Sequence, residues 1–378
     1  MDWEPRARQL ASETVHSCSR WSGPIVTTPR HVFVPRWWER HGDDMALRIG
    51  EDDPEAWMAR VYANETIVTR IGPHHADHAN PEDHPVGLPT SSSTLPGLLV
   101  QMYRHAMLTE GVKVLDVGTG TGYGTALLAR RFGAEHVTAV DVDPYLTEAA
   151  SKRLDSIGLY PTVRTVDATG DLPGTYDRII ATVSVRRIPA SWLAALRPGG
   201  RLVTTIAGTG VIVVADKTED GGAFGHTAPE GAGFMATRHG DDYDDHLSKV
   251  WDKAKDTDTA GEEITTSRYP LLFPPDDWAV FSMLQLTVPG IDFCKAEEDD
   301  TRTVWLLHED GSWARATATG FLDSPKVHQT GPRRLWDEFE RIRHRLNREG
   351  TLPVYGATVR ITPDGQTTLA RGGWSVTL

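Results

Sequence analysis

The sequence predicts an α/β fold in which a mostly parallel sheet lies between helices. The main observation is that strand-like and helix-like segments alternate from about residue 106 to 215, an order that requires parallel strands joined by right-handed crossovers. A second observation is a glycine-rich turn directly after the first of these strands. The expected strands are 112–117, 136–140, 162–166, 176–182 and 201–206, with 211–215 beside the last one, and the expected helices are 125–131, 146–157 and 190–196.

The length of 378 residues exceeds the usual size of one domain, so we expect more than one. Residues 1–105 contain short strand-like pieces and many prolines, and we expect them to form an extension on the substrate side of a central domain. A polar, glycine-rich stretch at 216–233 precedes an acidic one at 239–263, which places the end of the central domain (106–240) near residue 240.

Residues 241–378 are expected to form a C-terminal α+β domain. Asp310-Gly311 stands between strand-like flanks, which is a hairpin signal, and 358–361 with the segment after Asp364-Gly365 repeats it. Apolar residues in 335–347 recur at helical spacing, which predicts an amphipathic helix.

Composition excludes several classes of partner. The formal net charge of −13 argues against duplex nucleic acid, because phosphate binding needs a basic surface. Cys18 and Cys294 are too few for a disulfide framework, the N-terminus does not resemble a signal peptide, and no run is long enough to span a bilayer. We therefore expect a soluble, cytoplasmic protein without a membrane partner.

The glycine-rich turn lies in the segment 114–123, Val-Leu-Asp-Val-Gly-Thr-Gly-Thr-Gly-Tyr. Its glycines allow a tight turn and a close approach of a ligand, and Asp141 ends the next strand, where an acidic residue binds two ribose hydroxyls. A nicotinamide or flavin fingerprint would have glycine in place of Tyr123. Together with Asp116, the pattern favours S-adenosylmethionine over a dinucleotide, and the alternative is a tight turn in an ordinary α/β domain.

Three further segments resemble the protein L-isoaspartate O-methyltransferase family. Residues 29–35 (Pro-Arg-His-Val-Phe-Val-Pro) resemble its Arg-x-x-Phe-Val-Pro segment, and 92–96 (Ser-Ser-Thr-Leu-Pro) resemble its Thr-Ile-Ser-x-Pro segment. Residues 185–189 (Val-Arg-Arg-Ile-Pro), with the following 192–202, resemble the loop after its fourth strand. The resemblance spans about residues 20–210 in the family's order and implies a Rossmann-like, class I S-adenosylmethionine-dependent methyltransferase that releases S-adenosylhomocysteine.

The C-terminal extension and the serine-rich segment 91–94 depart from the short repair enzymes of the family. They resemble methyltransferases that act with ATP-grasp, lasso-peptide or lanthipeptide enzymes in the maturation of ribosomally made peptides. That branch implies methylation of one encoded aspartate, whose ester gives aspartimide or isoaspartate, with residues 241–378 recognising the peptide. The alternatives are repair of isoaspartate in damaged proteins and a non-catalytic binding protein.

The resemblance also implies the cofactor contacts. The glycine turn would pass under the methionine part, Asp116 would face that end, the next strand's end would bind the ribose, and a second acidic segment would meet the adenine. In that segment Val166 and Ala168 replace two family glycines. The implied contacts are Asp116, Gly118, Thr119, Gly120, Thr121, Gly122, Tyr123, Asp141, Val142, Asp167 and Ala168.

On the substrate side, Thr94 occupies the place of the family's active-site serine, and Ser92 and Ser93 are close competitors. The same run could instead be a linker or a helix N-cap. Arginines could attract an acidic substrate, and Phe33 and Val34 could line the pocket or belong to a buried strand. The implied substrate contacts are Arg30, Phe33, Val34, Ser184, Arg186 and Arg187.

The histidine-rich segment with His74, His75 and His78 could suggest a metal site. Its proline-rich context predicts a loop, and its spacing fits no structural zinc pattern, so we expect no metal and favour a mobile lid over the substrate. Methyl transfer to a carboxylate, which is already ionised at neutral pH, needs no metal and no strong general base.

Overall fold

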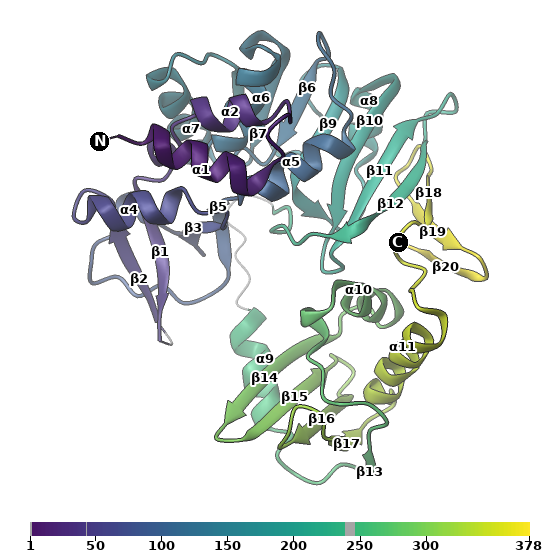
Figure 1. Ribbon diagram of the computed structural model, residues 1–378. Coiled ribbons are helices and arrows are strands. Elements are labelled where there is room, and N and C mark those ends of the chain that lie inside the picture. The colour runs from purple at the N-terminus through teal and green to yellow at the C-terminus, as the bar shows by residue number, and fades with distance from the viewer. Residues whose placement is uncertain (1, 43, 239–245) are drawn as a thin grey trace.

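The computed structural model describes residues 2–42, 44–238 and 246–378, and contains three sheets (Figure 1). The first belongs to the N-terminal region, where β1 and β3 pair centrally and β2, β4 and β5 are added around them, all antiparallel. The N-terminal elements are α1 (Glu4–Thr14), α2 (Ser22–Thr27), α3 (Arg30–Phe33), β1 (Arg36–His41), β2 (Asp44–Ile49), α4 (Pro54–Val61), β3 (Ile67–Ile71), β4 (His74–His75), the 3-10 helix η1 (Ala76–His78), β5 (Pro89–Ser93) and α5 (Pro96–His105).

The central sheet has ten strands in the order β8-β7-β6-β9-β10-β11-β12-β18-β19-β20. Strands β6 to β10 are parallel, as the alternation of strands and helices predicts, and β11 pairs antiparallel with β10. The elements of this part are β6 (Val114–Val117), α6 (Tyr123–Phe132), the 3-10 helix η2 (Ala134–His136), β7 (Val137–Asp141), α7 (Pro144–Ser156), β8 (Thr162–Thr165), β9 (Tyr176–Val185), α8 (Ala190–Ala195), β10 (Leu196–Ile206), β11 (Val211–Lys217) and β12 (Ala223–Gly231). The predicted α/β fold is therefore confirmed.

A five-stranded antiparallel sheet, β13-β17-β16-β15-β14, lies in the C-terminal part of the chain. The hairpin at Asp310-Gly311 and the amphipathic helix expected at 335–347 are both present, as β15–β16 and α11. The elements are α9 (His246–Lys255), β13 (Glu263–Thr266), the 3-10 helix η3 (Pro274–Asp276), α10 (Trp278–Thr287), β14 (Asp292–Glu298), β15 (Thr301–Leu307), β16 (Trp313–Ala318), β17 (Lys326–Thr330), α11 (Leu335–Glu349), β18 (Thr358–Ile361), β19 (Thr367–Arg371) and β20 (Trp374–Thr377).

Residues 241–378 do not form one separate domain as expected, because the last strands of the chain return to the central sheet. β18 pairs antiparallel with β12, and β19 and β20 extend the same sheet beyond it, as the yellow strands beside β12 in Figure 1 show. Thr227 fixes this contact, since its hydroxyl donates to the carbonyl of Val354 at 2.6 Å. Residues 241–378 are thus divided between two sheets, and the expected boundary itself falls at the edge of the undescribed residues 239–245.

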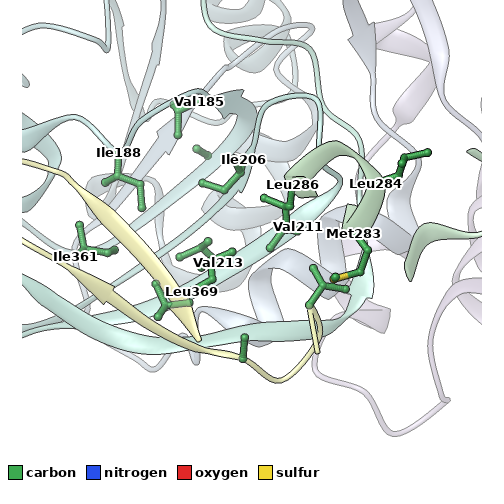
Figure 2. Close-up of a cluster of buried hydrophobic side chains, with 14 of the residues drawn as sticks. Val185, Ile188, Ile206, Val211, Val213, Met283, Leu284, Leu286, Ile361 and Leu369 are labelled. Atoms are coloured by element: carbon green, nitrogen blue, oxygen red, sulfur yellow. The ribbon is translucent and has the colours of Figure 1, made fainter. Parts of the chain in front are cut away.

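One apolar core continues from the central sheet into the C-terminal part. Figure 2 shows Met283, Leu284 and Leu286 of α10 gathered with residues of β11, and Ile361 and Leu369 of β18 and β19 in the same cluster. Burial of this shared apolar surface is the main force that joins the two parts. Within the described residues, no helix is long and apolar enough to cross a membrane.

We predict that Leu369→Ala destabilises the whole protein. Leu369 is fully buried in the shared core, so its truncation should cost about 2–5 kcal/mol of unfolding free energy. Leu322→Ala is the matched control, because that side chain is 86% exposed. Denaturant unfolding of both variants tests the prediction, and equal, small losses would contradict the integration of the last strands into the core.

Candidate functional site

A cleft of about 1060 Å³, measured out to open solvent, lies at the carboxyl ends of β6, β7 and β9. Ligands of open α/β sheets bind at this edge, because the strands end there and the loops diverge. Its walls come from the glycine turn, the ends of β7 and β9, the segment 90–98 and the segment 233–238. The lining residues include Thr90, Ser91, Ser92, Thr94, Leu98, Gly118, Gly120, Asp141, Val142, Leu146, Val166, Asp167, Ala168, Thr182, Val183 and the run from Gly233 to Arg238.

The floor of the cleft needs glycine at two positions of the turn. Gly118 has φ +90° and Gly120 has φ +52°, a region that residues with a Cβ rarely adopt. A Cβ on Gly118 would lie 2.6 Å from Cγ1 of Val183, and one on Gly120 would lie 3.3 Å from the carbonyl oxygen of Ser92. Glycine therefore lets β5 approach the turn and leaves the space between them open.

Two carboxylates lie in the cleft beside apolar side chains. Asp141 accepts hydrogen bonds from the backbone N–H groups of Gly120 at 2.9 Å and Asp143 at 3.1 Å, and burial raises its pKa. Asp167 accepts from the N–H and hydroxyl of Thr169 at 2.9 and 2.6 Å. The adjoining wall is apolar and consists of Val142, Leu146 and Val166.

This arrangement fits an adenosyl group with an attached amino acid. The carboxylate of Asp141 would receive ribose hydroxyls, the apolar wall would cover the adenine, and the open glycine turn would admit the amino-acid end. Of the expected cofactor contacts, the structure brings Gly118, Gly120, Asp141, Val142, Asp167 and Ala168 to the cleft.

The remaining expected cofactor contacts are not among the residues that line the cleft. Thr119 and Thr121 are buried, and Gly122 caps α6 with φ +92°. Tyr123 is buried, with its ring against Phe33 at a centroid distance of 5.9 Å. Asp116 is 2% exposed and accepts a hydrogen bond from the hydroxyl of Thr125 at 2.7 Å, and burial raises its pKa to about 7.

The opposite wall supplies hydroxyl groups from β5 and the residue that follows it. Ser92 and Thr94 line the cleft, whereas Ser93, which alternates with them, is 1% exposed. Thr90 and Ser91 of the same segment also line the cleft. Of the three expected hydroxyl-bearing residues, Ser92 and Thr94 therefore face the cleft, and Ser93 does not.

Arg30 does not reach the cleft, which corrects its expected role in attracting an acidic substrate. Its guanidinium is fully buried and donates to the carbonyls of Val61 at 2.9 Å, Ala63 at 2.8 Å and Glu65 at 2.9 Å. It also donates to the carbonyls of Ser93 and Thr94, both at 3.2 Å. Arg30 therefore fixes the end of β5, and through it the position of the cleft hydroxyls.

The other expected substrate contacts do not line the cleft either. Phe33 and Val34 are fully buried in the core, as the alternative of a buried strand requires, but Phe33 ends the helix α3 and lies in no strand. Arg186 and Arg187 are exposed just after β9 and do not line the cleft. Ser184 is 3% exposed and lies beneath the segment 233–238.

Residues 232–238, which we call the strap, belong to the site although none of them was expected there from the sequence. Two backbone hydrogen bonds join the strap to Ser184. The N–H of Ser184 donates to the carbonyl of Met235 at 2.8 Å, and the N–H of Thr237 donates to the carbonyl of Ser184 at 2.8 Å. The hydroxyl of Ser184 donates to the carbonyl of Phe234 at 3.0 Å. Since 233–238 all line the cleft, the strap forms one of its walls.

An ion-pair cluster joins the end of the strap to the cofactor side. Arg238 pairs with the carboxylate of Asp143 at 3.2 Å, and Arg70 of β3 pairs with the same carboxylate. Asp143 also caps α7 by accepting from the N–H of Tyr145 at 2.9 Å. One carboxylate, two residues after Asp141, therefore links the strap, the N-terminal sheet and α7.

The histidine-rich segment is held by contacts at His75 and Asp77, whereas His74 and His78 are exposed, and the lid stays a prediction. His75 is buried, and Asp77 accepts from the hydroxyl of Tyr145 at 2.7 Å and pairs with Arg153 of α7. Burial lowers the pKa of His75 to about 4. Among the residues that the structure describes, no group of three potential ligands is arranged to bind a metal.

We predict that Arg30→Met unfolds the N-terminal wall. The substitution leaves five carbonyl groups, two in buried and three in partly buried hydrogen bonds, without this donor, so the unfolding free energy should fall by at least about 3 kcal/mol. Arg187→Met, at an exposed position, is the control and should change stability little. Chemical denaturation measures both, and similar effects of the two changes would refute the structural role of Arg30.

We predict a pH-dependent effect for Asp116→Asn. The raised pKa means that Asp116 favours the folded state below its ordinary 3.8, and that this contribution is lost as pH rises through about 7. Asparagine keeps an acceptor for Thr125 but cannot ionise. The melting temperature of the variant relative to the natural protein should therefore be higher at pH 8 than at pH 5.

Asp155→Asn, at an exposed position, is the control for this experiment. A difference in melting temperature that is equal at both pH values would show that Asp116 is not stabilised in its protonated form.

The sequence of this chain is similar to those of one protein family. The family model "Protein-L-isoaspartate(D-aspartate) O-methyltransferase (PCMT)" matches residues 74–234. A protein-L-isoaspartate O-methyltransferase of Ignicoccus hospitalis is 34% identical over 139 residues, which are 35% of this chain and 66% of the relative. Protein-L-isoaspartate O-methyltransferase 1 of Archaeoglobus fulgidus is 32% identical over 217 residues, which are 55% of this chain and 83% of the relative.

The matched segment therefore covers slightly less than two thirds of the length of the Ignicoccus relative and 83% of the length of the Archaeoglobus relative. A solved structure named protein-L-isoaspartate O-methyltransferase superposes with a TM-score of 0.48 and 17% identity, covering 100% of this chain and 99% of that chain. On the sequence match to the Archaeoglobus relative, which includes most of that protein, this chain belongs to the protein-L-isoaspartate O-methyltransferase family.

Proposed function

We propose that this protein is an S-adenosylmethionine-dependent carboxyl O-methyltransferase that acts on an aspartyl side chain of a ribosomally made peptide. The observation that supports methyl transfer most strongly is that Asp141, the glycine turn and the hydroxyls of Ser92 and Thr94 line one cleft. The peptide substrate is proposed because the C-terminal sheet lies outside the residues that the family model matches.

When bound, S-adenosylmethionine supplies an electrophilic methyl group, which passes to a carboxylate oxygen as the sulfur–carbon bond breaks, leaving S-adenosylhomocysteine. The protein's task is to orient the carboxylate and to exclude water from it. The hydroxyls of Thr94 and Ser92 would donate to the carboxylate oxygen that is not methylated. No proton has to be removed, so the cleft needs no general base.

The methyl ester then reacts within the peptide. The backbone nitrogen of the next residue attacks the ester carbonyl, the carbon–oxygen bond to the methoxy group breaks, and methanol leaves with the amide proton. The product is an aspartimide, which water opens chiefly to isoaspartate.

Repair of isoaspartate in damaged proteins is the second candidate. It is favoured by the curated relatives, since those of Ignicoccus and Archaeoglobus are both named protein-L-isoaspartate O-methyltransferases. In that case the same transfer would act on the isoaspartyl carboxylate, and the enzyme would accept many sequences.

Mass spectrometry after incubation with S-adenosylmethionine separates the two candidates. The substrates are an isoaspartyl peptide and its aspartyl twin of the same sequence, and binding of S-adenosylhomocysteine is measured by calorimetry on the same protein. Methylation of the isoaspartyl peptide would establish repair and overturn the dedicated substrate. Binding without methylation of either peptide is the expected result for a dedicated peptide, and absence of binding would overturn methyl transfer itself.

We predict that Thr94→Val lowers kcat/KM by about 100-fold on whichever substrate is methylated. Valine preserves the shape of Thr94 but removes the hydroxyl, while Thr94→Ser retains it and should retain most activity. Ser92→Ala tests the second hydroxyl in the cleft, and Ser93→Ala, at a buried position, should cost less than either. A larger loss in Ser92→Ala than in Thr94→Val would assign the role to Ser92.

A further inference from the structure

Trp278 is the first residue of α10 and lies against the base of the strap. The N-cap Asp277 fixes the start of this helix, because its carboxylate accepts from the N–H groups of Ala279 and Val280, both at 3.0 Å. Trp278 itself is 43% exposed, which is unusual for a large aromatic residue at an internal contact. Its indole ring lies over three glycines.

The indole ring rests on backbone that only glycine leaves accessible. A Cβ placed on Gly210 would lie 2.5 Å from the ring, and one on Gly231 would lie 2.7 Å from it. A Cβ on Gly233 would lie 3.3 Å from the ring. Three glycines therefore lie against the ring of Trp278: Gly210 before β11, Gly231 at the end of β12 and Gly233 in the strap.

The same backbone leads directly into the cleft. Gly233 contacts Trp278 and also lines the cleft, and the next five residues line it without interruption. The carbonyl of Gly210 accepts from the N–H of Ala232 at 2.9 Å, which ties the base of the strap to the turn before β11. The strap thus runs from Trp278 at its base along the wall of the cleft.

The helix behind Trp278 is anchored in the core. Met283 and Leu284 of α10 pack in the cluster that contains Val211 and Val213 of β11, as Figure 2 shows. The backbone that carries the ring is therefore fixed by this core. The strap is therefore supported from the C-terminal side at its base and held by Ser184 farther along.

We propose that Trp278 is a positioning residue that keeps the strap closed over the cofactor cleft, so that the C-terminal part of the chain contributes to cofactor binding. This inference rests on the proposed function in that it takes the cleft as the S-adenosylmethionine site. Loss of the ring leaves a space over three glycines, and the strap then occupies its closed position for only part of the time. Cofactor affinity falls in proportion to that fraction.

The test compares Trp278→Ala with Trp278→Phe and with Trp251→Ala in the full-length protein. Trp251 is the matched control: it is 40% exposed, lies on α9 and contacts Trp305 of the C-terminal sheet at a centroid distance of 6.3 Å. Calorimetry measures S-adenosylhomocysteine affinity, and hydrogen exchange with mass spectrometry measures protection of peptides that contain residues 184 and 233–238. Melting temperatures record any general loss of stability.

We expect Trp278→Ala to weaken S-adenosylhomocysteine binding by about tenfold and to accelerate exchange of the strap, with Trp278→Phe intermediate and Trp251→Ala unchanged in both. Unchanged affinity and exchange in Trp278→Ala, or an equal loss in Trp251→Ala, would overturn the proposal. If the natural protein binds no S-adenosylhomocysteine, the proposed function fails, and strap exchange in the ligand-free variants still decides the role of Trp278.

Discussion

The antiparallel pairing of β12 with β11 is the constraint on which the rest of the site depends. β11 runs away from the carboxyl edge of the parallel strands, and β12 returns the chain to that edge, with Lys217 opposite Ala223 and Val211 opposite Gly231. The strap can therefore begin at Ala232 and cross the cleft directly. The free edge of β12 also gives β18 its partner, which brings the end of the chain back to the central sheet.

The two walls of the cleft are fixed by different physical means. On the N-terminal side, the buried guanidinium of Arg30 satisfies carbonyls from the segment 61–65 and from the end of β5, so charge-assisted hydrogen bonds determine where Ser92 and Thr94 stand. On the opposite side, backbone pairing with Ser184 and the ion pair between Arg238 and Asp143 hold the strap. Asp143 connects both sides, since Arg70 of β3 pairs with it as well.

The parts of this fold that local pattern determines could be predicted from the sequence. The turn with Gly118 and Gly120 and the position of Asp141 at the end of β7 follow from short segments, because strand ends and tight turns have local signals. The strap could not be predicted in this way. Residues 216–233 read as polar and glycine-rich, yet they include β12, whose stabilising partner β18 lies more than a hundred residues farther along the chain.

Long-range packing also explains why individual residues were misplaced. Arg30 has the charge of a substrate-binding residue, and only the tertiary structure shows that five carbonyls surround it. Ser184 carries a hydroxyl near the end of β9, but the strap covers it. Gly210, Gly231 and Gly233 come together with Trp278 only in the folded chain, where glycines that admit an aromatic ring mark a close approach of two segments.

This architecture changes how peptide recognition by the C-terminal part must be studied. A truncation near residue 240 would remove β18 and its neighbours, expose the edge of β12 and open the core around Met283 and Leu369. Loss of activity in such a fragment would report unfolding of the cofactor domain and would say nothing about substrate binding. Substitutions at exposed side chains of the C-terminal sheet region, such as Phe321 at 79% exposure, leave the shared core intact and can separate the two effects.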